Sequence, residues 1–543
     1  MPRKIYFLGS IVSLTIIAVV SLRWSPILWS LVVVGPIVLL GVHDIVQRKH
    51  TLLRIYPVIG HGRYLMELLR PEIQQYFVED NISGTPLSRE MRSIIYQRAK
   101  GALDTRPFGT QRDVYRVGYE WINHSLSPKP TLEEEPRVAI GTAQCRKPYA
   151  ASRLNISAMS FGSLSRNAIR SLNKGAKKGG FYHNTGEGGL SPYHLEFGGD
   201  VVWQIGTGYF GCRTSDGGFD PDKFQQNATR DSVRMIEIKL SQGAKPGHGG
   251  ILPGAKVTEE IAATRGVPVG LDVVSPPAHT AFSDPAGLLT FVQTLRELSN
   301  GKPVGFKLCV GDPVEFMGIC KAIISAGILP DFITVDGAEG GTGAAPLEFS
   351  NSVGTPLREG LTLVHHTLVG CGLRDKIRII AAGKVVTAFH MFKTIALGAD
   401  VCNSARGMMI SLGCLQARRC HDNTCPTGVA TQDPQRSRAV DVTDKAERVA
   451  RYHDDTIEAF LELLGAAGLD TAAEISPRHV LRRVDPVTVK SYAEIYPAVE
   501  PGSFLHDEID VRYLAAWRAA TPTSFRGDAI NCEPGGGLNI TSG

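Results

Sequence analysis

The sequence contains no block of basic residues, and its formal net charge is only +5. Without a concentrated positive patch, nucleic acid is not an expected partner. The chain also lacks a long internal repeat and a low-complexity linker. At 543 residues it can bury more than one core, although a single (β/α) barrel with insertions would account for most of it. Abundant glycine and moderate charge indicate a globular catalytic protein.

A convincing nicotinamide fingerprint is missing too. Residues 206–211 satisfy the pattern G-x-G-x-x-G, but no helical pattern follows them, so a pyrophosphate would lack a helix N-terminus. Three other glycine-rich loops, residues 184–189, 242–250 and 336–346, follow predicted strands. Their glycines let the backbone approach a planar ring, and Lys245 adds a point charge for a carboxylate or phosphate. These loops predict one large flat ligand, with a solvated surface turn as the alternative for residues 242–250.

A set of two C-x2-4-C knuckles, which structural zinc sites favour, is also absent. Most cysteines are scattered, several in apolar runs such as residues 306–310, which indicates free thiols in a reducing compartment. The exception is the C-x5-C-x4-C trio of Cys414, Cys420 and Cys425. Three thiolates suit a [3Fe–4S] cluster with one ligand for each iron. Zinc with His421 and three buried structural thiols are the alternatives.

Short β-rich runs alternate with helical patterns from residue 153 onward, as in parallel strands buried on both faces. The nine candidates are residues 154–159, 181–184, 201–205, 235–239, 267–274, 304–310, 332–336, 378–382 and 400–403. A closed (β/α)8 TIM barrel needs eight, so we assign residues 201–205 to an extra hairpin. The predicted fold class is therefore α/β, with the site at the carboxyl ends of the barrel strands.

Two successive strand–turn–helix units precede the cysteine trio. Their turns contain Gly383-Lys384 and Ser404-Ala405-Arg406. Such turns present backbone N–H groups and a helix N-terminus, which together bind phosphate. Because the cysteines follow at once, we expect a phosphorylated redox cofactor beside an iron–sulfur cluster.

Two apolar runs, residues 5–22 and 27–42, begin the chain. The first would form a helix of roughly 27 Å, close to the ~30 Å thickness of the hydrocarbon core. Basic residues flank the pair on its outer sides, at Arg3, Lys4, Arg48, Lys49 and Arg54. The positive-inside rule therefore predicts a transmembrane hairpin with both ends in the cytoplasm. A secretory signal peptide and an interfacial anchor are the alternatives.

The predicted organisation has four parts. Residues 1–46 form the transmembrane hairpin, and residues 47–150 a mostly helical connecting region. Residues 151–440 form the barrel with its cysteine segment, and residues 441–543 a C-terminal extension. Neither flanking region carries a motif with an assignable chemistry.

Several of these segments together resemble the FMN-binding synthase domain of glutamate synthases. The motifs that carry the likeness are residues 242–250, 275–277, 340–344 and, above all, 413–432. The similarity covers roughly residues 150–435. It implies a (β/α)8 barrel that holds FMN and a [3Fe–4S] cluster. It also implies the reduction of 2-iminoglutarate, formed from 2-oxoglutarate and ammonia, to L-glutamate.

The resemblance also implies roles for individual residues. Positions that bind FMN fall on Ser157, Met159, Ser160, Lys307, Gly341, Gly383, Lys384, Ser404, Ala405 and Arg406. Positions that bind substrate fall on Gln242, Lys245, Arg265 and Ser275, and the expected catalytic residues are Lys245 and Glu187. The cluster ligands would be Cys414, Cys420 and Cys425. A dicarboxylate needs two cationic clamps, which Lys245 and Arg265 can supply, although a solvated helix end is the alternative for Arg265.

Two departures from the family pattern concern the substrate. His248 stands where the family usually has Glu, and Ile251 where it usually has Gln. The chain also starts without a nucleophilic cysteine and is too short for the amidotransferase domain of the family, so we do not expect it to hydrolyse glutamine.

We therefore expect an oxidoreductase tethered to the cytoplasmic (inner) membrane, with its catalytic domain in the cytoplasm. It would make glutamate with free ammonia or ammonia from a separate glutaminase, and with electrons from ferredoxin or another donor. An FMN and iron–sulfur oxidoreductase acting on another oxo acid or imine is one alternative, and a membrane electron-transfer subunit is the other.

Overall fold

The computed structural model describes residues 2–103, 105, 107–506 and 508–528. The chain divides into two compact units, Met1–Arg89 and Glu90–Gly543.

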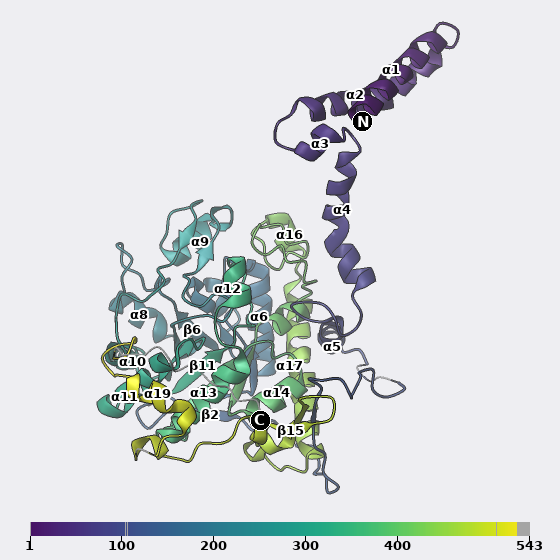
Figure 1. The fold of residues 1–543 in the computed structure, drawn as a ribbon. Helices are drawn as coiled ribbons and strands as arrows, with labels where there is room; N and C mark the ends of the chain where they lie inside the picture. The colour runs from purple at the N-terminus through teal and green to yellow at the C-terminus, as the bar shows by residue number, and fades with distance from the viewer. Residues whose placement is uncertain (1, 104, 106, 507, 529–543) are drawn as a thin grey trace. The chain divides into compact units, whose positions relative to one another are not determined.

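The larger unit is built around a closed barrel of eight parallel strands (Figure 1). In spatial order these are β4 (Leu154–Ile156), β5 (His183–Asn184), β6 (Val201–Ile205), β7 (Val233–Lys239), β10 (Val304–Leu308), β11 (Phe332–Asp336), β12 (Arg378–Ala382) and β13 (Val401–Ser404). Pairing of β13 with β4 closes the barrel. The continuous apolar runs bury both faces of the strands, and the predicted TIM barrel is confirmed.

The extra hairpin strand is not the one that the sequence analysis selects. Residues 201–205 form the third barrel strand, β6, with all five side chains buried and with β5 and β7 as neighbours. Residues 267–274 instead supply β9 (Val273–Val274), which pairs with β8 (Ile251–Leu252) outside the barrel. Pro268 lies in this run, and a proline cannot donate to the ladder of a central strand.

The helices that lie between the strands, or directly after the last of them, form an outer ring. They are α6 (Arg166–Gly179), α7 (Pro192–Leu195), α8 (Pro221–Ala228), α9 (Glu259–Arg265), α10 (Pro285–Leu298), α11 (Pro313–Ala326), α12 (Leu347–Ser352), α13 (Leu357–Gly370), α14 (Ala388–Ala396) and α15 (Arg406–Ser411). Several begin at a side chain that accepts a hydrogen bond from the first turn, as N-caps do: Ser165, Asp220, Thr258, Asp284, Asp312 and Thr387.

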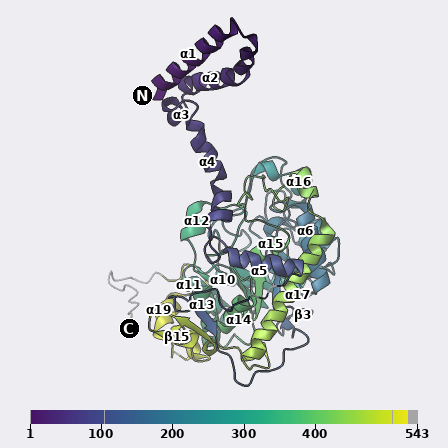
Figure 2. The same cartoon turned by 90° about the vertical axis from the view of Figure 1, so that its right-hand side faces the viewer.

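The ring is completed by α17 (Val442–Ala466), which packs against α6 and α14 (Figure 2). Helix α6 follows the first barrel strand and α14 the seventh, so α17 occupies the place of the eighth barrel helix. Its buried face includes Val449, Tyr452 and Phe460. The helical layer of the barrel thus continues into the segment that the sequence analysis assigns to the C-terminal extension.

The amino-terminal end of the barrel is closed by a hairpin of β2 (Val138–Ile140) and β3 (Tyr149–Ala151). Its side chains join a core cluster with strand residues such as Val202, Phe332 and Val401. The opposite end, where the strands finish, is therefore the one available for a site.

The connecting region is helical only in its first half. It contains α3 (Thr51–Ile55), α4 (Gly60–Ile73), a π-helical turn η2 (Gln74–Val78) and α5 (Arg89–Lys100). Among the described residues between Lys100 and Leu154, only the short strands β1 (Glu120–Ile122), β2 and β3 are regular. Prolines and glycines break the pattern there.

The C-terminal part adds β14 (Val480–Arg483), which pairs with β1 and with β15 (Val489–Ser491). Its last described helix, α19 (Val511–Ala519), contacts α11.

The smaller unit begins with α1 (Pro2–Ser21), a 3-10 helix η1 (Ser25–Ser30) and α2 (Leu31–Val46). Two helical stretches, Pro2–Ser21 and Ser25–Val46, are long and apolar enough to cross a membrane. The two helices approach closely, because a Cβ on Gly41 would lie 2.2 Å from the Tyr6 ring. A helical hairpin is therefore present where the sequence predicts one.

Candidate functional site

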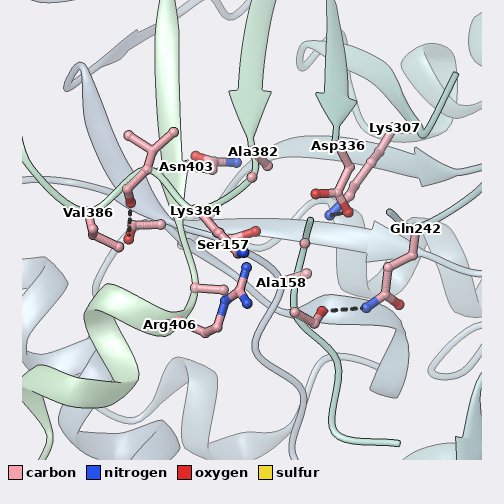
Figure 3. Close-up of a pocket in the computed structure, with 16 residues that line it drawn as sticks. Ser157, Ala158, Gln242, Lys307, Asp336, Ala382, Lys384, Val386, Asn403 and Arg406 are labelled. Atoms are coloured by element: carbon pink, nitrogen blue, oxygen red, sulfur yellow. Dashed lines mark hydrogen bonds and ion pairs between the residues drawn. The ribbon is translucent and has the colours of Figure 1, made fainter. Parts of the chain in front are cut away.

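A cavity with about 440 Å³ of empty space lies at the carboxyl ends of the barrel strands (Figure 3). Nine of the predicted site residues line it: Ser157, Gln242, Lys307, Gly341, Gly383, Lys384, Ser404, Ala405 and Arg406. They come from the ends of five different strands and from the loop after β11, as the barrel geometry requires.

One side of the cavity is cationic. Lys384 and Arg406 follow β12 and β13, and their side chains point toward one another in Figure 3. Burial and the neighbouring Arg406 lower the pKa of Lys384. Burial also lowers the pKa of Arg406, whose Nη2 donates to the carbonyl oxygen of Glu339. Two adjacent cations that repel each other in a buried site fit an anion such as a phosphate group.

The other side of the cavity contains a buried ion pair. Lys307 Nζ lies 3.0 Å from Asp336 Oδ2. The pKa of Lys307 is raised. Burial alone would lower it, but the nearby carboxylates of Asp336 and Glu237 have the larger combined effect. Asp336 Oδ2 also accepts a hydrogen bond from the Gly243 N–H at 3.0 Å. A protonated lysine, fixed by this pair, therefore faces the cavity.

A second group of charges adjoins the cavity through Gln242. Its side-chain nitrogen donates to the Gly341 carbonyl at 2.9 Å, and its side-chain oxygen lies 3.3 Å from Lys239 Nζ. Lys239 Nζ in turn lies 2.8 Å from Glu187 Oε2. We call Glu187, Lys239, Lys245 and Arg265 the charged cluster.

Glu187 is ionised within this cluster. Burial raises its pKa, but Lys239, Lys245 and Arg265 outweigh burial and lower it to about 2. The carboxylate is also held sterically, because a Cβ on Gly250 would lie 2.5 Å from Glu187 Oε1. The glycine-rich loop over residues 242–250 therefore closes directly onto this side chain.

Lys245 and Arg265 supply the remaining charge. Lys245 Nζ donates to the Ala344 carbonyl at 3.1 Å. Burial lowers the pKa of Lys245, although the nearby Glu187 acts in the opposite direction. Arg265 is 5% exposed, so it is not a solvated helix end. Its Nη2 donates to the Phe161 carbonyl at 3.2 Å, while its buried Nε has no partner among the described residues. Burial lowers the pKa of Arg265 to about 10.

The other predicted residues surround the cavity without being among those that line it. Met159 is buried, and its N–H donates to the Asn184 carbonyl at 2.9 Å, while the Ser160 hydroxyl contacts Ser163. Ser275 is buried, and its N–H donates to Gly250 at 2.9 Å. Ser275 thus lies next to the loop that covers Glu187.

The two unusual residues lie in the same loop. His248 Nδ1 is 2.8 Å from the Gly249 carbonyl, and its ring contacts the Phe349 ring at 5.2 Å. Ile251 lies in β8, opposite Val274. Neither is among the residues that line the cavity.

Sequence reasoning missed Lys239 and Asp336. Each ends a barrel strand, β7 and β11, in which most residues are apolar. A charged residue at the carboxyl end of a barrel strand is the signal that identifies them.

The cysteine trio lies between α15 and α16 (Pro434–Arg438). Burial, with Cys420 and Cys425 nearby, raises the pKa of Cys414 to about 12. All nine cysteines in the described part of the chain are free. Within that same part, no three His, Cys, Asp or Glu side chains gather closely enough for one metal ion, which gives no support to zinc with His421. A three-iron cluster keeps its thiolates farther apart than one ion does, because each binds a different iron.

Lys256 fixes this segment. Its Nζ is buried and donates to three carbonyl oxygens, those of Ser163 at 3.1 Å, Cys420 at 2.8 Å and Ala430 at 3.0 Å. The Gln416 N–H lies 3.4 Å from Cys414 Sγ, and Tyr96 of α5 donates to the Cys414 carbonyl at 2.6 Å. A buried cation thus fixes the backbone of the cysteine segment. It also opposes the rise that burial and the neighbouring Cys425 cause in the pKa of the Cys420 thiol.

Comparison with known proteins places these features in a family. A family model described as a conserved region in glutamate synthase matches residues 120–470. The chain is 38% identical over 494 residues to the glutamate synthase large subunit-like protein YerD of Bacillus subtilis, covering 82% of this chain and 93% of that protein. It is 37% identical over 317 residues to the archaeal glutamate synthase [NADPH] of Methanocaldococcus jannaschii, covering 58% of this chain and 59% of that protein. A solved flavocytochrome b2 variant with pyruvate bound is similar with a TM-score of 0.39 and 13% identity, covering 83% and 90% of the two chains.

Proposed function

The chain belongs to the glutamate synthase family, and we propose that it is an FMN and iron–sulfur oxidoreductase that forms L-glutamate from 2-oxoglutarate and ammonia. The observation that carries the proposal is the charged cluster beside the cavity. Three buried cations surround one ionised carboxylate there, which leaves a net positive site. A dicarboxylate with a polar nitrogen at its reacting carbon matches that pattern.

FMN fits the cavity at both ends. Lys384 and Arg406 would neutralise its phosphate, and Lys307, held protonated by Asp336, would face the polar edge of the ring. When bound, FMN supplies the hydride that reduces the imine. Ser157, Gly341, Gly383, Ser404 and Ala405 would line the cofactor, with Met159 and Ser160 supporting the first turn.

The charged cluster would bind the substrate. Lys245, whose Nζ donates to one carbonyl oxygen, and Arg265, whose Nε has no partner among the described residues, are suited to clamp the two carboxylates. Glu187 would accept a hydrogen bond from the substrate nitrogen and so orient the imine carbon. Lys245 Nζ, whose pKa is lowered by burial, would also donate a proton to that nitrogen. Gln242 and Ser275 would complete the pocket.

Cys414, Cys420 and Cys425 would each bind one iron of a [3Fe–4S] cluster. Electrons would enter through this cluster from ferredoxin or another donor. Ammonia would arrive free or from a separate glutaminase.

The helical hairpin would anchor the protein in the cytoplasmic (inner) membrane with the catalytic unit in the cytoplasm. Two apolar helices of sufficient length and the basic residues at the open end of the hairpin support this placement.

A second candidate keeps the cofactors and changes the substrate to another oxo acid or imine. His248 and Ile251, at positions where the family usually has Glu and Gln, favour it. A third, a membrane electron-transfer subunit, is favoured by the hairpin alone.

The decisive test is anaerobic glutamate formation by the detergent-purified full chain. The assay supplies methyl viologen reduced by dithionite, 2-oxoglutarate and ammonium, after visible and EPR spectra have established FMN and cluster content. We expect glutamate, and its loss in Lys245→Ala. Protein that contains both cofactors but makes no glutamate would overturn the proposal in favour of another substrate, and protein that turns over no small substrate would favour electron transfer.

A further inference from the structure

Helix α4 and the turn η2 that continues it carry an apolar face that the other described residues of the smaller unit leave uncovered. Six side chains form this face: Leu65, Met66, Leu69, Ile73, Tyr76 and Phe77. Their exposed fractions run from 42% for Leu69 and Ile73 to 85% for Phe77. Of the described residues in α4 and η2, only Gly60 is buried, and it lies in the first turn of α4.

The distribution of side chains around this helix is strongly amphipathic. Leu65, Leu69 and Ile73 recur every four residues and therefore lie on one face. The opposite face is polar and includes Arg63, whose Nε lies 3.0 Å from Glu67 Oε1. A short helix is marginal in water unless its apolar face is buried, so the α4 face needs an occupant.

The start of α4 is fixed at the base of the hairpin. Asp44, buried near the end of α2, accepts hydrogen bonds from the Val58 N–H and from His61 Nε2, each at 2.9 Å. His61 belongs to the first turn of α4. The helix therefore begins where the apolar part of α2 ends, and Figure 2 shows it leaving the hairpin at an angle rather than extending α2.

Positive charge gathers at this same end. The basic side chains there are Arg3, Lys4, Arg48, Lys49 and Arg54. Arg3 Nε donates to the carbonyl oxygen of Arg54, which places both at the hairpin base. Arg63 and Arg70 extend the charge along α4. Such a rim is attracted to anionic lipid headgroups.

We propose that α4 and η2 lie in the headgroup layer of the membrane, with the six-residue face against the upper acyl chains. The inference rests on the proposed membrane hairpin and adds a second lipid contact. Continuity with the hairpin and the basic rim favour lipid over a second copy of the chain as the occupant.

The test uses the full chain in vesicles of phosphatidylethanolamine and phosphatidylglycerol that contain a phospholipid with a photoreactive group on its acyl chain. After illumination, trypsin releases residues 5–23 from the hairpin and residues 64–89 from the α4 segment. Lipid adducts on both peptides are expected. Adducts on residues 64–89 should fall about tenfold in Leu69→Glu and Ile73→Glu, because a carboxylate there opposes burial in lipid.

Gln74→Glu, on the polar face, is the matched control and should keep its adducts. The hairpin peptide is the internal control in every variant. Adducts on residues 5–23 without adducts on residues 64–89 would overturn this inference and leave the hairpin standing, whereas adducts on neither would overturn both. Adducts on residues 64–89 that disappear as protein density in the vesicle rises would identify a second copy as the occupant and overturn the lipid contact.

Discussion

Lys239 Nζ and Glu187 Oε2 lie 2.8 Å apart, although 52 residues separate them in the chain. Lys239 ends the fourth barrel strand, and Glu187 lies in the loop after the second. The pair joins two sides of the charged cluster and keeps Glu187 ionised, because Lys239 is the first of the three cations that lower its pKa.

The substitution Lys239→Met should therefore disable the site without removing the cofactors. Without this cation, the buried Glu187 carboxylate keeps fewer positively charged partners. Its side chain is also no longer held in place. We expect kcat/KM for 2-oxoglutarate to fall by about 100-fold, as is typical when a group that positions the substrate is displaced. FMN content should stay unchanged. Lys223→Met, at an exposed lysine, is the control, and equal activity of the two variants would contradict the assignment.

Glu187 also predicts how stability depends on pH. Its pKa is about 2 in the folded chain against an ordinary value of 4.5, so folding favours the ionised form. The stabilisation is complete above pH 4.5 and is lost as the pH falls through about 2. At neutral pH it amounts to about 3 kcal/mol from this shift.

Thermal unfolding of the wild type and Glu187→Gln between pH 7 and pH 2 measures this contribution. We expect the stability difference between them to shrink as the pH drops from about 5 to 2. Glu196→Gln, at a carboxylate paired with Arg170 near the surface, should show a much smaller pH dependence. A difference that is constant with pH would mean that the pKa of Glu187 is not lowered by folding.

The side of the cavity that contains Lys384 and Arg406 could be predicted from the sequence because its signal is local. One strand–turn–helix unit contains Gly383-Lys384, and the next contains Ser404 to Arg406. The residues adjacent in the sequence are therefore enough to predict where these side chains lie. The Lys239 and Glu187 pair depends instead on the barrel closing, which brings the ends of different strands together. No local pattern contains that contact.

The same distinction explains the strand assignments. Residues 201–205 and 267–274 are both short apolar runs, and periodicity alone does not distinguish a barrel strand from an outer hairpin. Burial of all five side chains in β6 is a tertiary property. Likewise, α17 has the composition of a surface helix, and only its packing on α6 and α14 makes it part of the barrel.

Removal of the cationic cradle should weaken FMN binding. Lys384→Ala and Arg406→Ala each delete one of the two charges that repel each other when the phosphate is absent. We expect each to raise the Kd for FMN by about 10 to 100-fold, as for the loss of a charge-assisted hydrogen bond. Titration of the apoprotein with FMN, followed by flavin fluorescence, measures this. Lys376→Ala removes an exposed lysine and should leave the Kd unchanged; a similar Kd in all three variants would place the phosphate elsewhere.

Lys256 should determine whether the cysteine segment holds its cluster. Lys256→Met retains the apolar stem but leaves the carbonyl oxygens of Ser163, Cys420 and Ala430 without their common donor. Each unsatisfied buried group costs on the order of 1 to 3 kcal/mol, so the segment should loosen although no cysteine has changed. Iron content and the EPR signal of the oxidised cluster should fall, while FMN content stays normal because Lys256 is not among the residues that line the FMN cavity. The surface variant Lys178→Met should keep both. Full iron content in Lys256→Met, with an unchanged EPR signal, would show that the cysteine segment holds its position without this lysine.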